Sequence, residues 1–206
     1  MSLWRGDTPL ILASQSRARQ MLLANAGIAF EAAPARIDER AIQQAIEHDM
    51  GSAAPSVVAG RLAREKALAV SARKPGRYVI GADQTLALGV RLFNKPDGRA
   101  QAHSQLQALA GQRHELHSAI AVVRDDTILF EHVAIAGLSM RPLRDTEIAA
   151  YLDEAGDAVT SSVGAYQLEG LGVHLFDRIE GDHFTILGLP LLPLLGFLRG
   201  EGLLAI

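Results

Sequence analysis

Hydroxyl and guanidinium groups gather where a short apolar run gives way to a helical pattern. The run Leu10–Ala13 has the length and composition of a buried strand, and Ser14, Ser16, Arg17 and Arg19 follow it. The start of a helix exposes unpaired amides at the positive end of the helix dipole, and arginine can bind phosphate through two hydrogen bonds. The pattern predicts a phosphate-binding site, with an ordinary serine-capped helix and solvated arginines as the alternative.

Three carboxylates are candidates for acid–base or metal chemistry. Asp83 follows the apolar run Tyr78–Ala82, and we expect it at the carboxyl end of a buried strand, a common catalytic position in α/β folds. Asp38 and Glu39 are adjacent, and oxygen ligands of this kind bind divalent cations. The alternative for this second pair is a solvated loop.

Two lysines add candidate cations. The sequence predicts a helix over Pro55–Arg73, in which Lys66 shares one face with apolar residues at steps of four. Its side chain either carries a fixed charge into a cleft or extends along the apolar surface to reach water. Lys95 precedes Pro96, which restricts its backbone to extended geometry and can hold the side chain in place.

The bulk composition is that of a globular protein, and several classes of function are disfavoured. The chain has 206 residues with 49% hydrophobic and 21% charged residues, and we expect one domain over residues 1–206 because no repeat or linker is seen. The net charge of -3 argues against a nucleic-acid partner. The absence of cysteine excludes disulfides, thiolate nucleophiles and zinc–cysteine sites.

The sequence gives no sign of a membrane partner. Its most apolar segment, Ile186–Leu198, contains two prolines and two glycines and is too short to span a bilayer. The amino-terminal residues lack the apolar core of a signal peptide, so we expect a cytoplasmic protein.

Further strands and helices are expected around these residues. Apolar spacing and turn residues predict a strand at Phe30–Ala33, a helix at Ala100–Ala110, strands at His114–Arg124 and Ile128–Leu138, a helix at Asp145–Ala155, a glycine-rich loop at Ser161–Gly172, a strand at Val173–Ile179 and a last helix from Pro190. The histidines at 114 and 117 are one residue short of the helical zinc motif and lie on a predicted strand, so we reject a zinc site there.

Taken together, these segments resemble the Maf family of nucleoside triphosphate pyrophosphatases. The resemblance runs from Leu10 to Leu198 and rests on collinear motifs, namely L-A-S-x-S-x-x-R at Leu12–Arg19, I-D-E at Ile37–Glu39, E-K-A at Glu65–Ala67, I-G-A-D-Q at Ile80–Gln84, N-K-P at Asn94–Pro96, G-A-Y-x-x-E-G at Gly164–Gly170 and G-L-P-L at Gly188–Leu191. Each motif is weak alone, and their order makes the set specific.

The resemblance implies an elongated α/β fold of two lobes that share a long, twisted, mixed sheet, with a nucleotide cleft between them. Family members hydrolyse a nucleoside triphosphate to the monophosphate and pyrophosphate with a divalent metal, Mg²⁺ or Mn²⁺. By this resemblance Asp83 would be the proton acceptor, and Ser14, Ser16, Arg19 and Lys66 would bind the phosphate chain. The chemistry of the reaction adds Lys95 as a further cation and Glu39 and Asp83 as metal ligands, and either carboxylate could activate the water, hold the metal or do both. Members often form homodimers, and some are linked to inhibition of septum formation.

Three positions bear on the base. Members that prefer dTTP and UTP typically carry Arg, Thr and Gln where this chain has Ala18, Gln84 and Glu169. Gln84 and Glu169 instead resemble the branch credited with 7-methyl-GTP pyrophosphatase activity, which typically has Trp in place of Ala18. A carboxylate can accept both the N1–H and the 2-amino group of guanine, whereas uracil and thymine offer one donor between two acceptors.

The sequence therefore predicts hydrolysis of 7-methyl-GTP or another guanine-like triphosphate. The alternatives are a dTTP/UTP pyrophosphatase of the same family and a non-catalytic nucleotide-binding regulator linked to septum formation. Many relatives carry a lysine where this chain has Ser161-Ser162 before the glycine motif, so one phosphate contact of the family is missing here.

Overall fold

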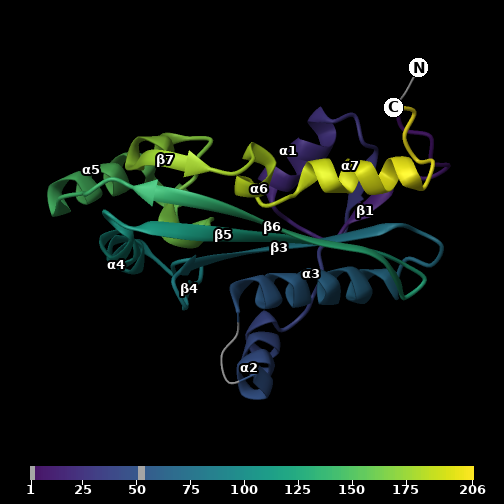
Figure 1. The fold of residues 1–206 in the computed structure, drawn as a ribbon, viewed down its shortest axis with the longest axis horizontal. Helices are drawn as coiled ribbons and strands as arrows, with labels where there is room; N and C mark the ends of the chain where they lie inside the picture. Colours follow the sequence, from purple (N-terminus) through teal and green to yellow (C-terminus); the bar gives the residue numbers. More distant parts are fainter. Residues whose placement is uncertain (1–2, 51–53) are drawn as a thin grey trace.

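The computed structural model describes residues 3–50 and 54–206 (Figure 1). Its strands are β1 Leu10–Leu12, β2 Phe30–Ala32, β3 Val79–Leu88, β4 Arg91–Phe93, β5 Arg113–Arg124, β6 Thr127–Met140 and β7 Phe176–Glu180. Its α-helices are α1 Arg17–Asn25, α2 Glu39–Met50, α3 Pro55–Ser71, α4 Arg99–Leu109, α5 Asp145–Ala155, α6 His183–Ile186 and α7 Leu191–Gly200. Short 3₁₀ turns lie at η1 Gly156–Thr160, η2 Val163–Ala165 and η3 Leu171–Leu175.

The described strands form one mixed sheet in the order β2-β1-β3-β5-β6-β7, with β4 beside β3. The pairs β1–β2 and β1–β3 are parallel, and all other pairs are antiparallel. Figure 1 shows β3, β5 and β6 running along the length of the molecule, with α1, β1 and α7 towards one end and α4, α5 and β7 towards the other. The predicted mixed α/β fold is confirmed.

Two helices cover opposite faces of the central strands (Figure 1). The apolar side chains of α7, such as Leu194, pack with Leu10 and Leu12 of β1. On the other face, α3 packs through small residues, and a Cβ at Gly81 would lie 2.0 Å from the carbonyl oxygen of Ala63. Only glycine at position 81 permits this close approach of helix to strand.

The long strand β3 changes its neighbour along one edge. β1 pairs with it as far as Ile80, and β4 pairs with it from Leu86 onward. Residues 81–85 therefore have no neighbouring strand on that side, while on the other side they pair with β5. The expected end of this strand at Ala82 is wrong, because the pairing with β5 carries the strand on to Leu88 and leaves Asp83 in its interior.

Other boundaries also differ from expectation. The sequence analysis missed α2. A carboxylate oxygen of Asp38, the residue before this helix, accepts from the amide of Ala41, 3.0 Å away. It also missed β4, and the expected strand from Val173 begins only at Phe176. A Cβ at Gly172 would lie 2.4 Å from the carbonyl oxygen of Gln167, so the chain coils tightly there before it extends.

The remaining predicted elements are present. The first helix ends two residues before Gly27, which has a left-handed φ of +68°, and the helices α4 and α5 lie where the apolar spacing predicts them. Among the described residues, no helix combines the length and apolar character needed to cross a bilayer.

Candidate functional site

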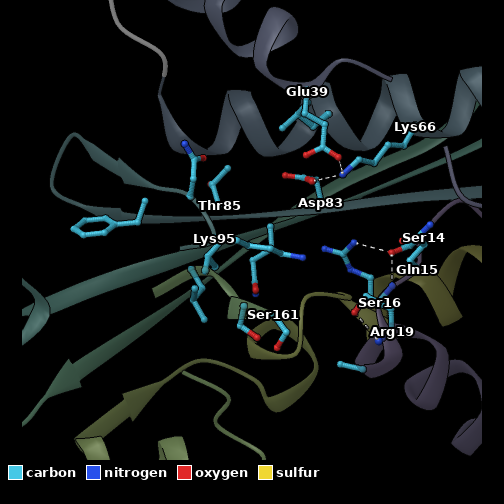
Figure 2. Close-up of a pocket in the computed structure, with 18 of the residues that line it drawn as sticks. Ser14, Gln15, Ser16, Arg19, Glu39, Lys66, Asp83, Thr85, Lys95 and Ser161 are labelled. Carbon is cyan, nitrogen blue, oxygen red and sulfur yellow. Dashed lines mark hydrogen bonds and ion pairs between the residues drawn. The ribbon is translucent and has the colours of Figure 1, made fainter. Parts of the chain in front are cut away.

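A cleft of about 950 Å³ opens where residues 81–85 lack a neighbouring strand (Figure 2). With the exception of Arg17, the residues that the sequence analysis proposed for the site line this cleft: Ser14, Ser16, Ala18, Arg19, Glu39, Lys66, Asp83, Gln84, Lys95 and Glu169. The structure thus brings together side chains from α1, α2, α3, β3, the loop after β4 and the glycine-rich segment.

At the start of α1, one arginine is directed into the cleft and the other is not. Ser16 caps the helix, with its Oγ accepting from the amide of Arg19 at 3.4 Å. It also lines the cleft, so the helix-cap alternative and a place in the site do not exclude each other. Arg17 is exposed and does not line the cleft, so its predicted contribution of charge at the site is wrong.

The guanidinium of Arg19 is held by three acceptors. Its Nη1 donates to the Ser14 hydroxyl at 3.0 Å and to the carbonyl of Ala82 at 2.8 Å, and its Nε donates to the carbonyl of Gly188 at 2.8 Å. Burial lowers the pKa of Arg19, although nearby Asp83 and Glu39 oppose this shift and the group stays charged. The side chain therefore presents a fixed positive charge at the cleft.

Lys66 joins the two carboxylates. Its Nζ lies 2.6 Å from Oδ1 of Asp83 and 2.8 Å from Oε1 of Glu39, as the dashed lines in Figure 2 show. Only 12% of the Lys66 side chain is exposed, so its ammonium group is directed into the cleft rather than out to bulk water. Of the two readings left open by the sequence, the structure supports the fixed cation.

Asp83 is buried at the centre of this network. Burial raises the pKa of the Asp83 carboxyl, and the positive charges of Lys66 and Arg19 act in the opposite direction. A carboxylate with a raised pKa accepts a proton more readily than an ordinary aspartate, as general-base catalysis requires.

The donor set near Lys66 fits a hard divalent cation. Glu39 and Asp83 approach the same ammonium nitrogen, so their oxygen atoms lie close together at the cleft. Mg²⁺ is commonly bound by one or two carboxylates together with substrate phosphates. In residues 3–50 and 54–206, no group of three or more acidic or histidine side chains is arranged to hold a metal without such help. Asp38 also lines the cleft, but its carboxylate caps α2. Of the two adjacent carboxylates, Asp38 therefore holds the start of the helix and Glu39 contacts Lys66.

Comparison with known proteins agrees with this geometry. A family model described as Maf-like protein matches residues 9–201. The chain belongs to the Maf-like protein family. It is 66% identical over 206 residues to a protein of Bradyrhizobium diazoefficiens and 65% identical over 205 residues to one of Rhodopseudomonas palustris (strain BisB18), each match covering 100% of both chains.

Both of these relatives carry the name nucleoside triphosphate pyrophosphatase. A protein of Rhizobium etli named 7-methyl-GTP pyrophosphatase is 56% identical over 193 residues, which cover 94% of this chain and 96% of that protein. The predicted family and enzyme class are confirmed.

In the Maf-like cleft, Gln84, which follows Asp83 on β3, is fixed by its amide nitrogen. Its Nε2 lies 2.8 Å from the Ser118 hydroxyl oxygen and 3.1 and 3.0 Å from the carbonyl oxygens of Thr185 and Ile186. Backbone carbonyls only accept, so the nitrogen must face them and Oε1 is the free polar atom of the amide. Glu169 is exposed at the rim, and Ala18 packs partly against the core.

The sequence analysis missed the contribution of the segment Thr185–Gly188 to this Maf-like site. Its carbonyl groups accept from Gln84 and Arg19, and Gly188 has a left-handed φ of +86°. The Gly188–Pro190 sequence signals a turn but does not reveal which distant side chains its backbone contacts.

Proposed function

We propose that this Maf-like protein hydrolyses a guanine-like nucleoside triphosphate, with 7-methyl-GTP favoured, to the monophosphate and pyrophosphate. The reaction would need a divalent cation, Mg²⁺ or Mn²⁺, held by Glu39 and Asp83 together with the phosphates. That cation would supply charge neutralisation at the phosphate oxygens.

The chain's own residues account for the rest of the chemistry. Attack of water at the α-phosphorus places charge on the nucleotide and on the departing pyrophosphate, and Arg19, Lys66 and Lys95 would neutralise it. Asp83 would accept the proton of the attacking water, which its raised pKa favours. Ser14 and Ser16 would donate from their hydroxyl groups to phosphate oxygens at the start of α1.

The observation that carries the choice of base is the fixed amide of Gln84. Its Nε2 lies within hydrogen-bond distance of three oxygen atoms, so Oε1 is the atom with which this amide would contact a base in the cleft. Glu169 offers a carboxylate, which also only accepts. Two acceptors match the neighbouring N1–H and 2-amino donors of guanine. A pyrimidine would leave at least one acceptor unpaired, a mismatch that costs about 1–3 kcal/mol.

Ala18 bears on how well a methylated base is recognised. A small side chain here cannot stack on the base, so the attraction of an aromatic ring for a positively charged 7-methylguanine, about 1–2 kcal/mol, is absent at this position. We therefore expect a smaller preference for 7-methyl-GTP over GTP than for GTP over UTP. The name of the Rhizobium etli relative supports this choice of substrate class.

A panel of triphosphates tests the proposal. The purified chain is incubated with Mg²⁺ and 7-methyl-GTP, GTP, ATP, UTP or dTTP, and pyrophosphate release is measured. We expect the two guanine nucleotides to give the highest kcat/KM. Fastest hydrolysis of dTTP or UTP would instead support the pyrimidine alternative, and binding without release would support the regulator.

A pair of variants tests the role of Glu169. Glu169→Gln replaces an acceptor by a group that also donates, and we expect the preference for GTP over UTP to fall about tenfold. Glu154→Gln makes the same change at an exposed position on α5 outside the cleft and should leave the preference unchanged. An unaltered preference in Glu169→Gln would contradict the assignment.

A further inference from the structure

Two histidines of β5, His114 and His117, are buried and have no part in the reaction described above. Only 1% and 6% of their surfaces are exposed. An imidazole removed from water loses the hydrogen bonds that water provides, so its contacts within the protein must compensate. What each ring contacts therefore indicates what it does.

The two rings contact different parts of the molecule. They are three residues apart on one strand, so they lie on opposite faces of the sheet. Nε2 of His114 lies 2.7 Å from the hydroxyl oxygen of Tyr166, in the glycine-rich segment. Nδ1 of His117 lies 2.7 Å from the hydroxyl oxygen of Ser56, in the first turn of α3.

The segment that contains Tyr166 does not hold its shape by local preference. Gly164 and Ala165 have left-handed φ angles of +77° and +62°, and such a backbone is costly for alanine. Tertiary contacts maintain it, since the carbonyl of Ala165 accepts from the hydroxyl of Tyr151 at 3.2 Å and the ring of Tyr166 packs edge-on against Phe176. Glu169 follows three residues after Tyr166.

Histidine at position 114 carries a cost that an apolar residue would avoid. In the part of the chain that the structure describes, its buried Nδ1 has no hydrogen-bond partner. An apolar side chain would fill the site without an unpaired nitrogen. The contribution that histidine makes beyond packing is thus the hydrogen bond of Nε2 to Tyr166.

We propose that His114 is a positioning residue for base recognition, acting through Tyr166 to hold the glycine-rich segment so that Glu169 faces the base. This inference rests on the proposed function and names a residue outside the cleft that sets its selectivity. Loss of the hydrogen bond would free the segment, so that Glu169 would discriminate less between bases, while the phosphate end would stay intact.

The experiment measures binding, so that it does not depend on turnover. Isothermal titration calorimetry gives the Kd of GTP and UTP analogues with a methylene group between the α and β phosphorus atoms. In Tyr166→Phe and in His114→Phe, we expect the preference for the GTP analogue to fall about tenfold. The double variant should fall no further than either single variant, because both remove the same hydrogen bond.

Two further variants serve as controls. His114→Gln keeps an amide that can reach the hydroxyl of Tyr166, and it should retain most of the preference. His117→Gln also alters a buried imidazole of β5, but one that contacts α3, and it should lower the melting temperature without changing the preference. Tyr166→Phe removes a single oxygen atom, so it remains informative if His114→Phe does not fold.

Specific results would overturn the inference. These are an unchanged preference in Tyr166→Phe, an equal loss in His117→Gln, or a wild-type chain that binds both analogues equally. Hydrolysis of GTP by the wild type is measured in parallel. Selective binding without pyrophosphate release would overturn the proposed function and leave the role of His114 standing.

Discussion

At the proposed phosphate end of the cleft most of the charged groups sit on regular elements and Lys95 follows β4 in a loop, whereas Glu169, the charged group at the proposed base end, sits between two turns. Arg19 and Lys66 project from helices, Asp83 projects from the middle of β3, and each of the three contacts at least one charged or backbone partner. Glu169 lies between the short turns η2 and η3, at an exposed position. The two ends therefore differ in how firmly the fold fixes their side chains.

This difference separates two tasks. Every nucleotide has the same triphosphate, so the phosphate end gains from rigid placement of charge. The base varies between nucleotides, and irregular segments accept sequence changes more readily than strands or helices do. Substitutions at the phosphate end should then change the rate or affinity for all nucleotides alike, and those at the base end should change the ranking of nucleotides.

The largest expected effect is at the centre of the phosphate end. Asp83→Asn removes the proposed proton acceptor, and we expect kcat to fall by about 10²–10⁴-fold for every triphosphate. Pyrophosphate release gives kcat, and calorimetry with a methylene analogue gives Kd, which should change little. Asp38→Asn is the matched control, since asparagine still caps α2 and activity should stay near wild type. Persistent turnover in Asp83→Asn would remove this aspartate from the proposed role.

The next effect is on stability and belongs to the base end. Burial, with a smaller contribution from Arg113, lowers the pKa of His114 from 6.5 to about 4. The folded state thus binds fewer protons than the unfolded chain between these values, so stability is present above pH 6.5 and falls as the pH drops towards 4. The expected loss is about 3 kcal/mol.

Urea unfolding of the wild type and of His114→Gln between pH 4 and pH 7 checks this prediction. Carboxylates titrate over the same range in both proteins, so the difference between the two curves reports on His114. A steeper loss in the wild type is expected. Parallel curves would show that the imidazole is not held neutral by its surroundings.

The smallest expected effect tests most directly whether the two ends of the cleft act independently. Arg19→Lys keeps the charge but loses the planar group that bonds to Ala82 and Gly188, and we expect Kd for triphosphate analogues to rise about tenfold. The increase should be the same for GTP and UTP analogues. Arg17→Lys, at an exposed position of the same helix, should have no effect. A change in the ratio between bases would show that the two ends are not independent.

The contrast between regular elements and turns also explains which parts of the site the sequence could predict. Apolar runs identify β1, and helical spacing with Gly27 as a stop identifies α1, so the residues at this junction could be located from local pattern. Local pattern placed Asp83 at the end of a strand rather than within it, because the continuation of β3 depends on pairing with β5, which is distant in the sequence. It also failed at Phe176, where packing of Gly172 on Gln167 delays the start of β7.

Some parts of the site have no local signal at all. The contacts of Arg19 with Gly188 and of His114 with Tyr166 join residues 169 and 52 positions apart. Each depends on how strands and turns meet in three dimensions. Collinear motifs could identify the family and place the residues in one cleft, but they could not show which backbone carbonyls or histidines hold those residues.

The hydrogen bond from Arg19 to Gly188 also has a consequence for biosynthesis. The guanidinium of Arg19 gains the third of its three contacts only once the turn after α6 has left the ribosome and docked against α1. A nascent chain stalled before Thr185 would still contain Asp83, Lys66 and Glu39. It would lack the carbonyl group of Gly188 that accepts from Arg19 and those of Thr185 and Ile186 that accept from Gln84, so the cleft would be complete only after this turn had been synthesised.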